Sequence, residues 1–372
     1  MNVLIAPNAF KGCLSAPQAG RIMARSLPRD WEYTLCPIAD GGDGTLDCLV
    51  SATDGRYFKA MVTGPLAGTK VIARWGFLGK DPTAIIEMAE ASGLRLLSRG
   101  QYSPSHTTTF GVGELVLKAL EAGYKKIFVG LGGSATNDGG SGCADALGAR
   151  FLDSNGNKLP AGGIHLLDLA KIDISLMDTR LEECEIVCLA DVNCVLSGPT
   201  GTSRIYARQK GASNQEIELL DDALAHFSQI ILHQLHIDFG AIPGSGAAGG
   251  LAAGLIGLCN ARAVSGTERI LDLIGVDQKL SACDAVITGE GRIDEQTLQG
   301  KGVAGIGSRA KRLGKQVHVF AGRVSGETQE MCRQLGVDAI HQITPGGLSD
   351  EEGMKRVEEL LEASVRDVVT KW

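Results

Sequence analysis

Short runs of β-branched and apolar residues recur along this chain, and each ends in a polar, glycine-bearing loop that usually leads into a helical pattern. The segments with this form are 3–6, 33–39, 126–129, 186–190, 285–288, 317–321 and 339–343. Alternation of strand, loop and helix is typical of parallel sheets with helices on their faces. Strands that are apolar along most of their length fit burial on both faces. We therefore expect an α/β fold.

Helical patterns fill several of the intervals. The strongest are expected at 15–27, 110–122, 214–235 and 351–369. The first begins with Ser15 and has Pro17 two residues later, which is a typical helix start. The helix at 214–235 carries apolar residues at helical spacing, and the one at 351–369 is highly charged on one face.

The segment 56–90 differs because apolar and polar residues alternate in it, with a turn expected at Gly64-Pro65. This pattern predicts antiparallel strands and marks a change of domain. We place one domain at both termini, 1–60 and 276–372, with a five-stranded doubly wound parallel sheet. Residues 61–275 then form an inserted, mixed α/β domain. Ligands of doubly wound sheets bind beyond the carboxyl ends of the strands, so we expect the active site in the cleft between the domains.

Charge and cysteine usage limit the function. The 372-residue chain has a net charge of −7 and no basic block, so nucleic-acid binding is not expected. Its apolar stretches are too short for a membrane span, and the first is too short for a signal peptide. The ten cysteines contain no C-x-x-C motif, which suits free thiols in a reducing compartment. We expect a cytoplasmic protein that acts on a small molecule.

Two glycine-rich loops carry acidic or hydroxyl side chains. In the loop 39–45, Asp40 and Asp43 could hold Mg²⁺ or a substrate hydroxyl, although a tight turn with a capping aspartate is an alternative. The loop 130–142 follows a strand and precedes a helical pattern. Its backbone N–H groups could point together at a phosphate, and no P-loop Gly-Lys-Ser/Thr follows. The candidate donors in it are Gly132, Gly133, Ser134, Thr136 and Asn137.

The segment 244–250 matches G-x-G-x-x-G through Gly244, Gly246 and Gly249. Pro243 precedes it and no clear strand leads into it, so the match to a dinucleotide fingerprint is weak. A nucleotide phosphate could rest there, but close packing of a small-residue helix explains the glycines equally well.

Charged residues of both signs follow the strand at 285–288. Glu290, Arg292, Asp294 and Lys301 suit phosphoryl chemistry, whereas a surface loop with Asp294 as a helix cap is the alternative. Lys11, in the first loop, could neutralise phosphate charge.

Asp191 ends another apolar strand and could accept a proton from a substrate hydroxyl, or could simply cap a turn. His233 and His236 have no visible third ligand, so we do not expect them to bind metal.

Five motifs resemble those of the bacterial glycerate kinases of type 1. They are APNAFKGCLSAPQA, ADGGDGT, GLGGSATNDGGSG, PGSGAAGGLAAG and TGEGRIDEQTLQGK, and they cover nearly the whole chain in the family's order. The resemblance implies ATP-dependent phosphorylation of D-glycerate with Mg²⁺, and 2-phosphoglycerate as the expected product, with 3-phosphoglycerate possible. It also implies two α/β domains, one of them Rossmann-like and discontinuous. A homodimer is a possible assembly.

Within that hypothesis, glycine-rich loops hold the ATP phosphates. Asp43 and Asp138 are the candidate Mg²⁺ ligands. Lys11 or Lys301 offsets charge during transfer, and Asp191 or Asp294 deprotonates the attacking hydroxyl. Arg292 or Lys11 holds the glycerate carboxylate, with Asp40 and Glu290 as further substrate-binding candidates.

Two other functions stay open from the residues alone. An NAD(P)-dependent hydroxy-acid oxidoreductase would rest on the G-x-G-x-x-G match. A non-catalytic sugar-acid-binding protein would bind glycerate without consuming ATP.

Overall fold

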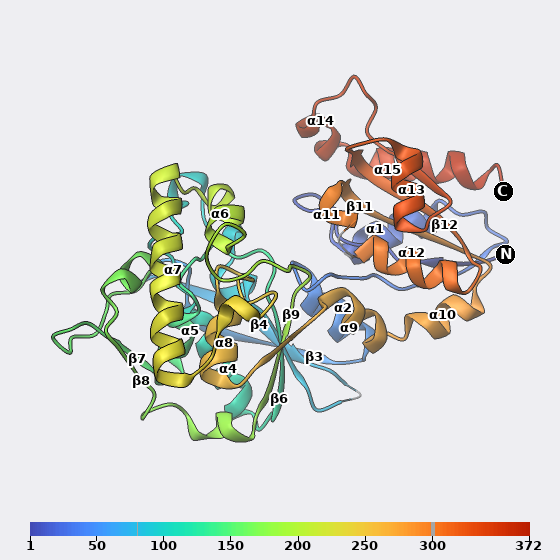
Figure 1. Cartoon of the computed structure of the whole chain (residues 1–372). Coiled ribbons are helices and arrows are strands. Elements are labelled where there is room, and N and C mark those ends of the chain that lie inside the picture. The colour runs from blue at the N-terminus through green and yellow to red at the C-terminus, as the bar shows by residue number, and fades with distance from the viewer. Residues whose placement is uncertain (80, 299–301) are drawn as a thin grey trace. The chain divides into compact units, whose positions relative to one another are not determined.

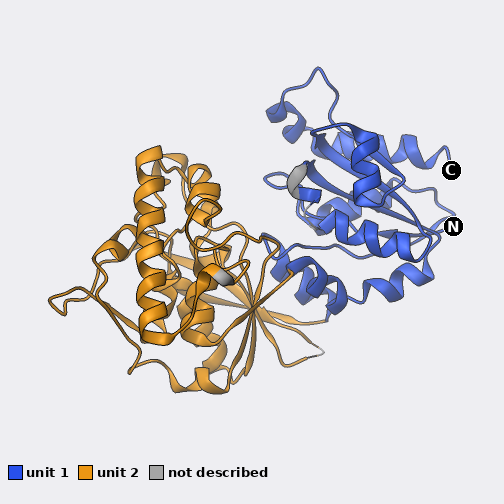
Figure 2. Cartoon of the chain, in the orientation of Figure 1, with its two compact units in different colours: residues 1–53, 266–372 blue, residues 54–265 orange. Residues whose placement is uncertain are grey.

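The computed structural model describes residues 1–79, 81–298 and 302–372, and the chain divides into two compact units (Figure 2). Unit 1 comprises Met1–Thr53 and Gly266–Trp372, and unit 2 comprises Asp54–Ser265. The divisions lie seven and ten residues before the expected 60/61 and 275/276 boundaries. β3 (Arg56–Thr63) pairs along its whole length with β4 (Lys70–Phe77), so all of it belongs to unit 2. α9 (Gly266–Leu273) contacts α12 (Gly302–Arg312), so it belongs to unit 1.

Unit 1 contains a five-stranded parallel sheet (Figure 1). In spatial order its strands are β13 (Ala339–Gln342), β12 (Gln316–Val324), β11 (Ala285–Ile293), β1 (Asn2–Ile5) and β2 (Glu32–Leu35). Every neighbouring pair is parallel. The five strands predicted for the terminal domain are these, and the α/β fold class is confirmed.

Some helices of unit 1 contact this sheet, and the others contact neighbouring helices. The helices are α1 (Ala16–Arg25), α2 (Thr45–Ala52), α9, α10 (Val276–Ala282), α11 (Glu295–Leu298), α12, α13 (Thr328–Leu335), α14 (Asp350–Lys355) and α15 (Val357–Val369). α1 begins as expected, because Ser15 and Gln18 form a capping box and a proline occupies the first turn. α1 and α15 contact each other and share a core with Val3 and Ile287.

The prediction of a single helix at 351–369 is wrong, because the helix is interrupted at Arg356. That residue has φ −106° and ψ 13°, outside the α-helical region. The two pieces have different surroundings. α14 is mostly exposed, whereas Val357, Leu361 and Val365 of α15 are buried in the core of unit 1. The sequence did not reveal this difference, because α14 and α15 have similar patterns of charged residues.

We expect a histidine pair to make the stability of unit 1 depend on pH. His318 Nδ1 and His341 Nε2 lie 3.0 Å apart, and the His318 ring packs edge-on against Trp372. Burial and the neighbouring His341 lower the pKa of His318 to about 4, while Asp338 acts in the opposite direction. Burial and Lys371 also lower the pKa of His341, against Asp367.

Because these folded-state pKa values lie below the unfolded value, the stabilisation is present above pH 6.5 and is lost as the pH falls toward 4. We expect unit 1 to lose roughly 1–2 kcal/mol between pH 7 and pH 5. Thermal melts at half-unit pH steps will measure this. His318→Phe, which has an aromatic ring that cannot be protonated, should flatten the dependence of stability on pH. His233→Gln, at an exposed position, should leave it unchanged.

Unit 2 contains a mixed six-stranded sheet. Its order is β10 (Arg262–Val264), β9 (Glu185–Leu189), β6 (Lys126–Gly130), β5 (Ala84–Glu87), β4 and β3. The first four strands are parallel to one another, and β4 and β3 are added antiparallel. The antiparallel strands predicted within 56–90 are confirmed. A small antiparallel pair, β7 (Arg150–Leu152) and β8 (Lys171–Asp173), lies apart from this sheet.

The α-helices of unit 2 include α7, which has the predicted bounds. They are α3 (Ala89–Ser92), α4 (Phe110–Glu121), α5 (Ser141–Ala146), α6 (Thr202–Tyr206), α7 (Asn214–Leu235) and α8 (Leu251–Cys259). Short 3₁₀ turns occur at Leu94–Leu96, Arg99–Gln101, Gly163–Asp168, Thr179–Glu183, Arg208–Lys210 and Phe239–Ala241. In the described part of the chain, no helix has the length and apolar character to cross a membrane.

Candidate active site

A cavity of about 310 Å³ lies in unit 1, at the edge of the sheet where β1, β2, β11 and β12 end. Five residues proposed from the sequence line it, namely Lys11, Asp40, Glu290, Arg292 and Asp294. They come from three loops or strand ends far apart in the sequence. They meet because the carboxyl ends of parallel strands lie along one edge of a sheet. This cavity is the candidate active-site pocket of unit 1.

The position of Lys11 depends on a close approach between two backbones. A Cβ atom on Gly291 would lie 3.3 Å from Lys11 N and 3.4 Å from Phe10 Cα. Gly291 therefore allows β11 to run directly beside the loop that carries Lys11. That loop is closed by paired backbone hydrogen bonds between Phe10 and Leu14. Lys11 itself is exposed at the pocket, where it can meet an anionic ligand.

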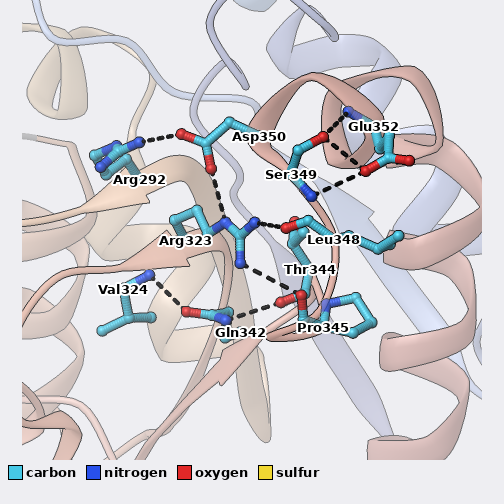
Figure 3. Close-up of polar contacts among 10 residues, drawn as sticks. All are labelled: Arg292, Arg323, Val324, Gln342, Thr344, Pro345, Leu348, Ser349, Asp350 and Glu352. Atoms are coloured by element: carbon cyan, nitrogen blue, oxygen red, sulfur yellow. Dashed lines mark hydrogen bonds and ion pairs between the residues drawn. The ribbon is translucent and has the colours of Figure 1, made fainter.

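Two pocket residues that the sequence reasoning missed are Arg323 and Asp350 (Figure 3). Arg323 Nε donates to Asp350 Oδ1 at 2.9 Å, and Arg292 Nη2 donates to Asp350 Oδ2 at 2.9 Å. β11 and β12 pair so that Arg292 and Arg323 are direct neighbours across the strands. The basic residue in the GRVSG loop after 317–321 was a signal that could have found Arg323.

Asp294 lines the pocket and also caps a helix. Its backbone N–H donates to Thr297 Oγ1 at 3.3 Å, and its Oδ1 accepts from Thr297 N at 3.3 Å. The two interpretations of Asp294 are therefore compatible, since one carboxylate oxygen takes part in the cap. Lys301, the other cation expected nearby, lies outside the described residues.

Asp40 and Asp43 lie in the loop after β2, and their surroundings differ. Asp40 lines the pocket, and its Oδ1 accepts from Gly42 N at 3.0 Å, as in a tight turn. Asp43 is half-buried just before α2 and does not line the pocket. The described ranges contain no group of three or more His, Cys, Asp or Glu side chains suited to hold a metal ion.

The glycine-rich loop 130–142 of unit 2 divides into an accessible part and a buried part. Gly133 is exposed, and Gly132 and Ser134 are half-buried. Thr136 and Asn137 are fully buried. Asn137 Nδ2 donates to Ser203 Oγ at 2.9 Å, so that amide is used inside the protein. Gly132–Ser134 can therefore meet a phosphate without rearrangement of the loop, whereas Thr136 and Asn137 cannot.

The buried part of this loop is held by Lys210, which the sequence reasoning did not single out. Its Nζ donates to the carbonyl oxygen of Thr136 at 2.7 Å. Burial lowers the pKa of Lys210 to about 8, although Cys194 and Asp138 act in the opposite direction. Lys210 is 74 residues from Thr136 in the chain, and no local pattern marks it.

Asp138 is fully buried and surrounded by donors of the protein itself. Thr109 N and Thr109 Oγ1 donate to its Oδ2 at 2.7 and 2.9 Å. Gly140 N and Gly142 N donate at 3.1 and 3.3 Å. Burial raises the pKa of Asp138, while these hydrogen bonds lower it in part. The arrangement favours a structural role for Asp138, which ties the loop to α4, over the metal-binding role suggested by the sequence.

Gly244, Gly246 and Gly249 are buried, and the nearest neighbour of each is a backbone atom. A Cβ atom on Gly249 would lie 2.0 Å from Thr136 O, and one on Gly246 would lie 2.3 Å from Val195 O. Gly139 N donates to Gly249 O at 3.0 Å, so the two glycine-rich segments pack on each other. The element directly before Gly244 is the 3₁₀ turn Phe239–Ala241 and not a strand. This geometry favours the packing interpretation of the G-x-G-x-x-G match.

Asp191 follows β9 in unit 2 and is half-buried. Ser265 Oγ donates to its Oδ1 at 2.7 Å. Asp191 is not among the residues that line the pocket of unit 1. Its position at a strand end is as predicted.

Another charged cluster lies beside Gly132–Ser134, and the sequence did not predict it. Arg95 Nη2 lies 2.7 Å from Glu90 Oε1 and 3.6 Å from Glu87 Oε1. Burial raises the pKa of Glu90, but hydrogen bonds from Arg74 and Arg95 outweigh it and hold that pKa below its usual value. Leu94 N donates to Gly133 O at 2.9 Å, so Arg95 follows directly on the segment that pairs with the loop.

Comparison with known proteins agrees with this architecture. The model of the "Glycerate kinase family" matches residues 3–372. The chain is 43% identical to a glycerate 2-kinase of Escherichia coli K12, over 94% of this chain and 93% of that protein. It is 40% identical to a glycerate kinase of Halalkalibacterium halodurans, over 100% and 98%. The crystal structure of "putative glycerate kinase 2" from Salmonella typhimurium LT2 matches with a TM-score of 0.83 and 41% identity, over 100% and 98%. Family model, relatives and solved structure agree along the whole chain, which belongs to the glycerate kinase family.

Proposed function

We propose that this chain transfers the γ-phosphoryl group of ATP to the 2-hydroxyl of D-glycerate and forms 2-phosphoglycerate. The observation that carries the proposal is the pocket of unit 1, where Lys11, Arg292 and Asp294 line one cavity. A hydroxy acid needs a cation for its carboxylate and a base for its hydroxyl, and this set supplies both. The name of the E. coli relative, glycerate 2-kinase, supports the choice of hydroxyl.

In the proposed mechanism, Arg292 and Lys11 bind the glycerate carboxylate through charge-assisted hydrogen bonds. Asp294 accepts the proton of the attacking hydroxyl, and we prefer it to Asp191 because it lines the same cavity as Arg292. The backbone N–H groups of Gly132–Ser134 bind phosphate oxygens. Phosphoryl transfer depends mainly on position and electrostatics, so these residues act chiefly by orienting the groups and by balancing charge.

We propose that the implied Mg²⁺ binds to carboxylates of the loop after β2. Mg²⁺ is usually held by one or two carboxylates, with waters and substrate phosphates in its other positions. We propose Asp43 as that carboxylate, with Asp40 turned into the pocket. When bound, Mg²⁺ would neutralise charge on the ATP phosphates.

We also propose a cytoplasmic location. None of the ten cysteines, all of which lie in the described ranges, forms a disulfide. Eight of them are buried, and buried free thiols suit a reducing compartment. A homodimer stays a prediction, and light scattering during size-exclusion chromatography will measure the mass in solution.

One assay tests the proposed reaction. The protein is mixed with Mg-ATP and D-glycerate, ADP is measured by coupled absorbance, and the product is identified by ³¹P NMR. We expect ADP and 2-phosphoglycerate in equal amounts. 3-phosphoglycerate would overturn the choice of hydroxyl. Glycerate binding without ADP would instead support a sugar-acid-binding protein, and a glycerate-dependent change of a nicotinamide signal would support an oxidoreductase.

A further inference from the structure

The carboxylate of Asp350 occupies the position that an anionic ligand of the two pocket arginines would take. One oxygen accepts from Arg323 and the other from Arg292, each at 2.9 Å (Figure 3). A carboxylate held by two guanidinium groups in this way reproduces the recognition of a substrate carboxylate or phosphoryl group.

Arg323 is held more rigidly by the protein than Arg292 and Asp350 are. Arg323 has 21% of its side chain exposed, and it also donates to the carbonyl oxygens of Leu348 and Pro345. Arg292 and Asp350 are 51% and 60% exposed. Exposed ion pairs contribute little to stability, so a bound anion can replace Asp350 at small cost. Arg323, by contrast, keeps its carbonyl contacts and remains oriented toward the pocket.

α14 does not need Asp350 in order to form. Ser349 and Glu352 make a capping box at its start, independent of either arginine. At its other end, a Cβ atom on Gly12 would lie 3.0 Å from Met354 Cε, so α14 also contacts the loop that carries Lys11. Asp350 is therefore available for a role in the pocket.

We propose that Arg323 and Arg292 together bind the oxyanion of a substrate, and that Asp350 is an internal competitor which this oxyanion displaces. The inference rests on the proposed function, and it adds a binding residue, Arg323, and a device that sets the affinity of the pocket. Weakly charged molecules would fail to displace Asp350, so the competitor favours ligands with a full carboxylate or phosphoryl charge.

The test compares three variants of the full chain by isothermal titration calorimetry. Asp350→Asn removes the competing charge but keeps the shape, and it should tighten binding of the displacing ligand about three- to fivefold. Arg323→Gln should weaken binding at least tenfold. Glu351→Gln is the matched control, because Glu351 lies next to Asp350 in α14 but pairs only with Lys355 in the described contacts. It should bind as the unchanged protein does.

D-glycerate and ATP are titrated separately, so the experiment distinguishes a carboxylate from a phosphoryl group as the displacing oxyanion. The proposal is overturned if Asp350→Asn binds both ligands no more tightly than Glu351→Gln, or if Arg323→Gln binds both normally. Circular dichroism confirms that each variant is folded.

Failure of the proposed function has a different signature. If the three variants bind as expected but the unchanged protein forms no ADP, the kinase assignment is wrong and the oxyanion site is supported. If ADP forms normally and the affinities do not change, the inference alone falls. If neither ligand binds to the unchanged protein, both are wrong.

Discussion

Asp294→Asn is expected to lower kcat for D-glycerate by about two to four orders of magnitude, because asparagine cannot accept the hydroxyl proton. Asparagine caps helices as well as aspartate does, so the contact with Thr297 N should persist and the chain should remain folded. Steady-state kinetics with Mg-ATP will measure kcat and KM. Calorimetry with D-glycerate should show binding close to that of the unchanged protein.

Asp191→Asn is the comparison variant. Asparagine can still accept the hydrogen bond of Ser265 Oγ, so the substitution isolates the loss of charge. We expect it to lower kcat less than tenfold. If Asp191→Asn lowered kcat by several orders of magnitude and Asp294→Asn had near-normal kcat, Asp191 would be the catalytic base. Near-normal turnover in both would remove both from the mechanism.

Gly249→Ala is expected to destabilise unit 2 by at least about 3 kcal/mol, or to prevent folding. Gly249 has φ +66°, and the added methyl group would lie 2.0 Å from Thr136 O. Since that atom belongs to the backbone, relief requires the two glycine-rich segments to separate. Urea unfolding followed by circular dichroism will measure the change.

Gly123→Ala is the matched control for backbone conformation. Gly123 has φ +87°, but a Cβ atom there would meet no neighbour within 4 Å. Only the cost of the left-handed conformation should remain, about 1 kcal/mol. If Gly249→Ala were as stable as this control and lost only ATP affinity, Gly249 would be a nucleotide contact, and the packing interpretation would be wrong.

The strands and most helices could be predicted because their signals are local. Apolar runs at 285–288 and 317–321 locate strands without knowledge of their partners, and the apolar spacing in 214–235 locates α7. The interruption at Arg356 could not be predicted, since the pattern of charges continues across it. Burial of Val357 in the core distinguishes the two helices there, and burial depends on tertiary contacts.

The candidate site was foreseen in part for the same reason. Lys11, Asp40 and Arg292 follow strand patterns, and the parallel sheet brings strand ends together. The role of Asp138 was not predictable, because its main donor, Thr109, is 29 residues away. Arg323 and Asp350 are 27 residues apart, and nothing in their local sequence indicates that they meet.

The sequence by itself determined where the glycine-rich loops of this protein lie, which of them carry acids and cations, and that all of them except 244–250 follow strands. Only the tertiary structure decided which residues of each loop are accessible and which are packed inside the protein. Gly132–Ser134 are accessible while Thr136 and Asn137 are buried, although one glycine-rich run contains them all. The physical reason is that composition sets what a loop can bind, whereas accessibility depends on atoms such as those of Gly249, which are distant in sequence and adjacent in space.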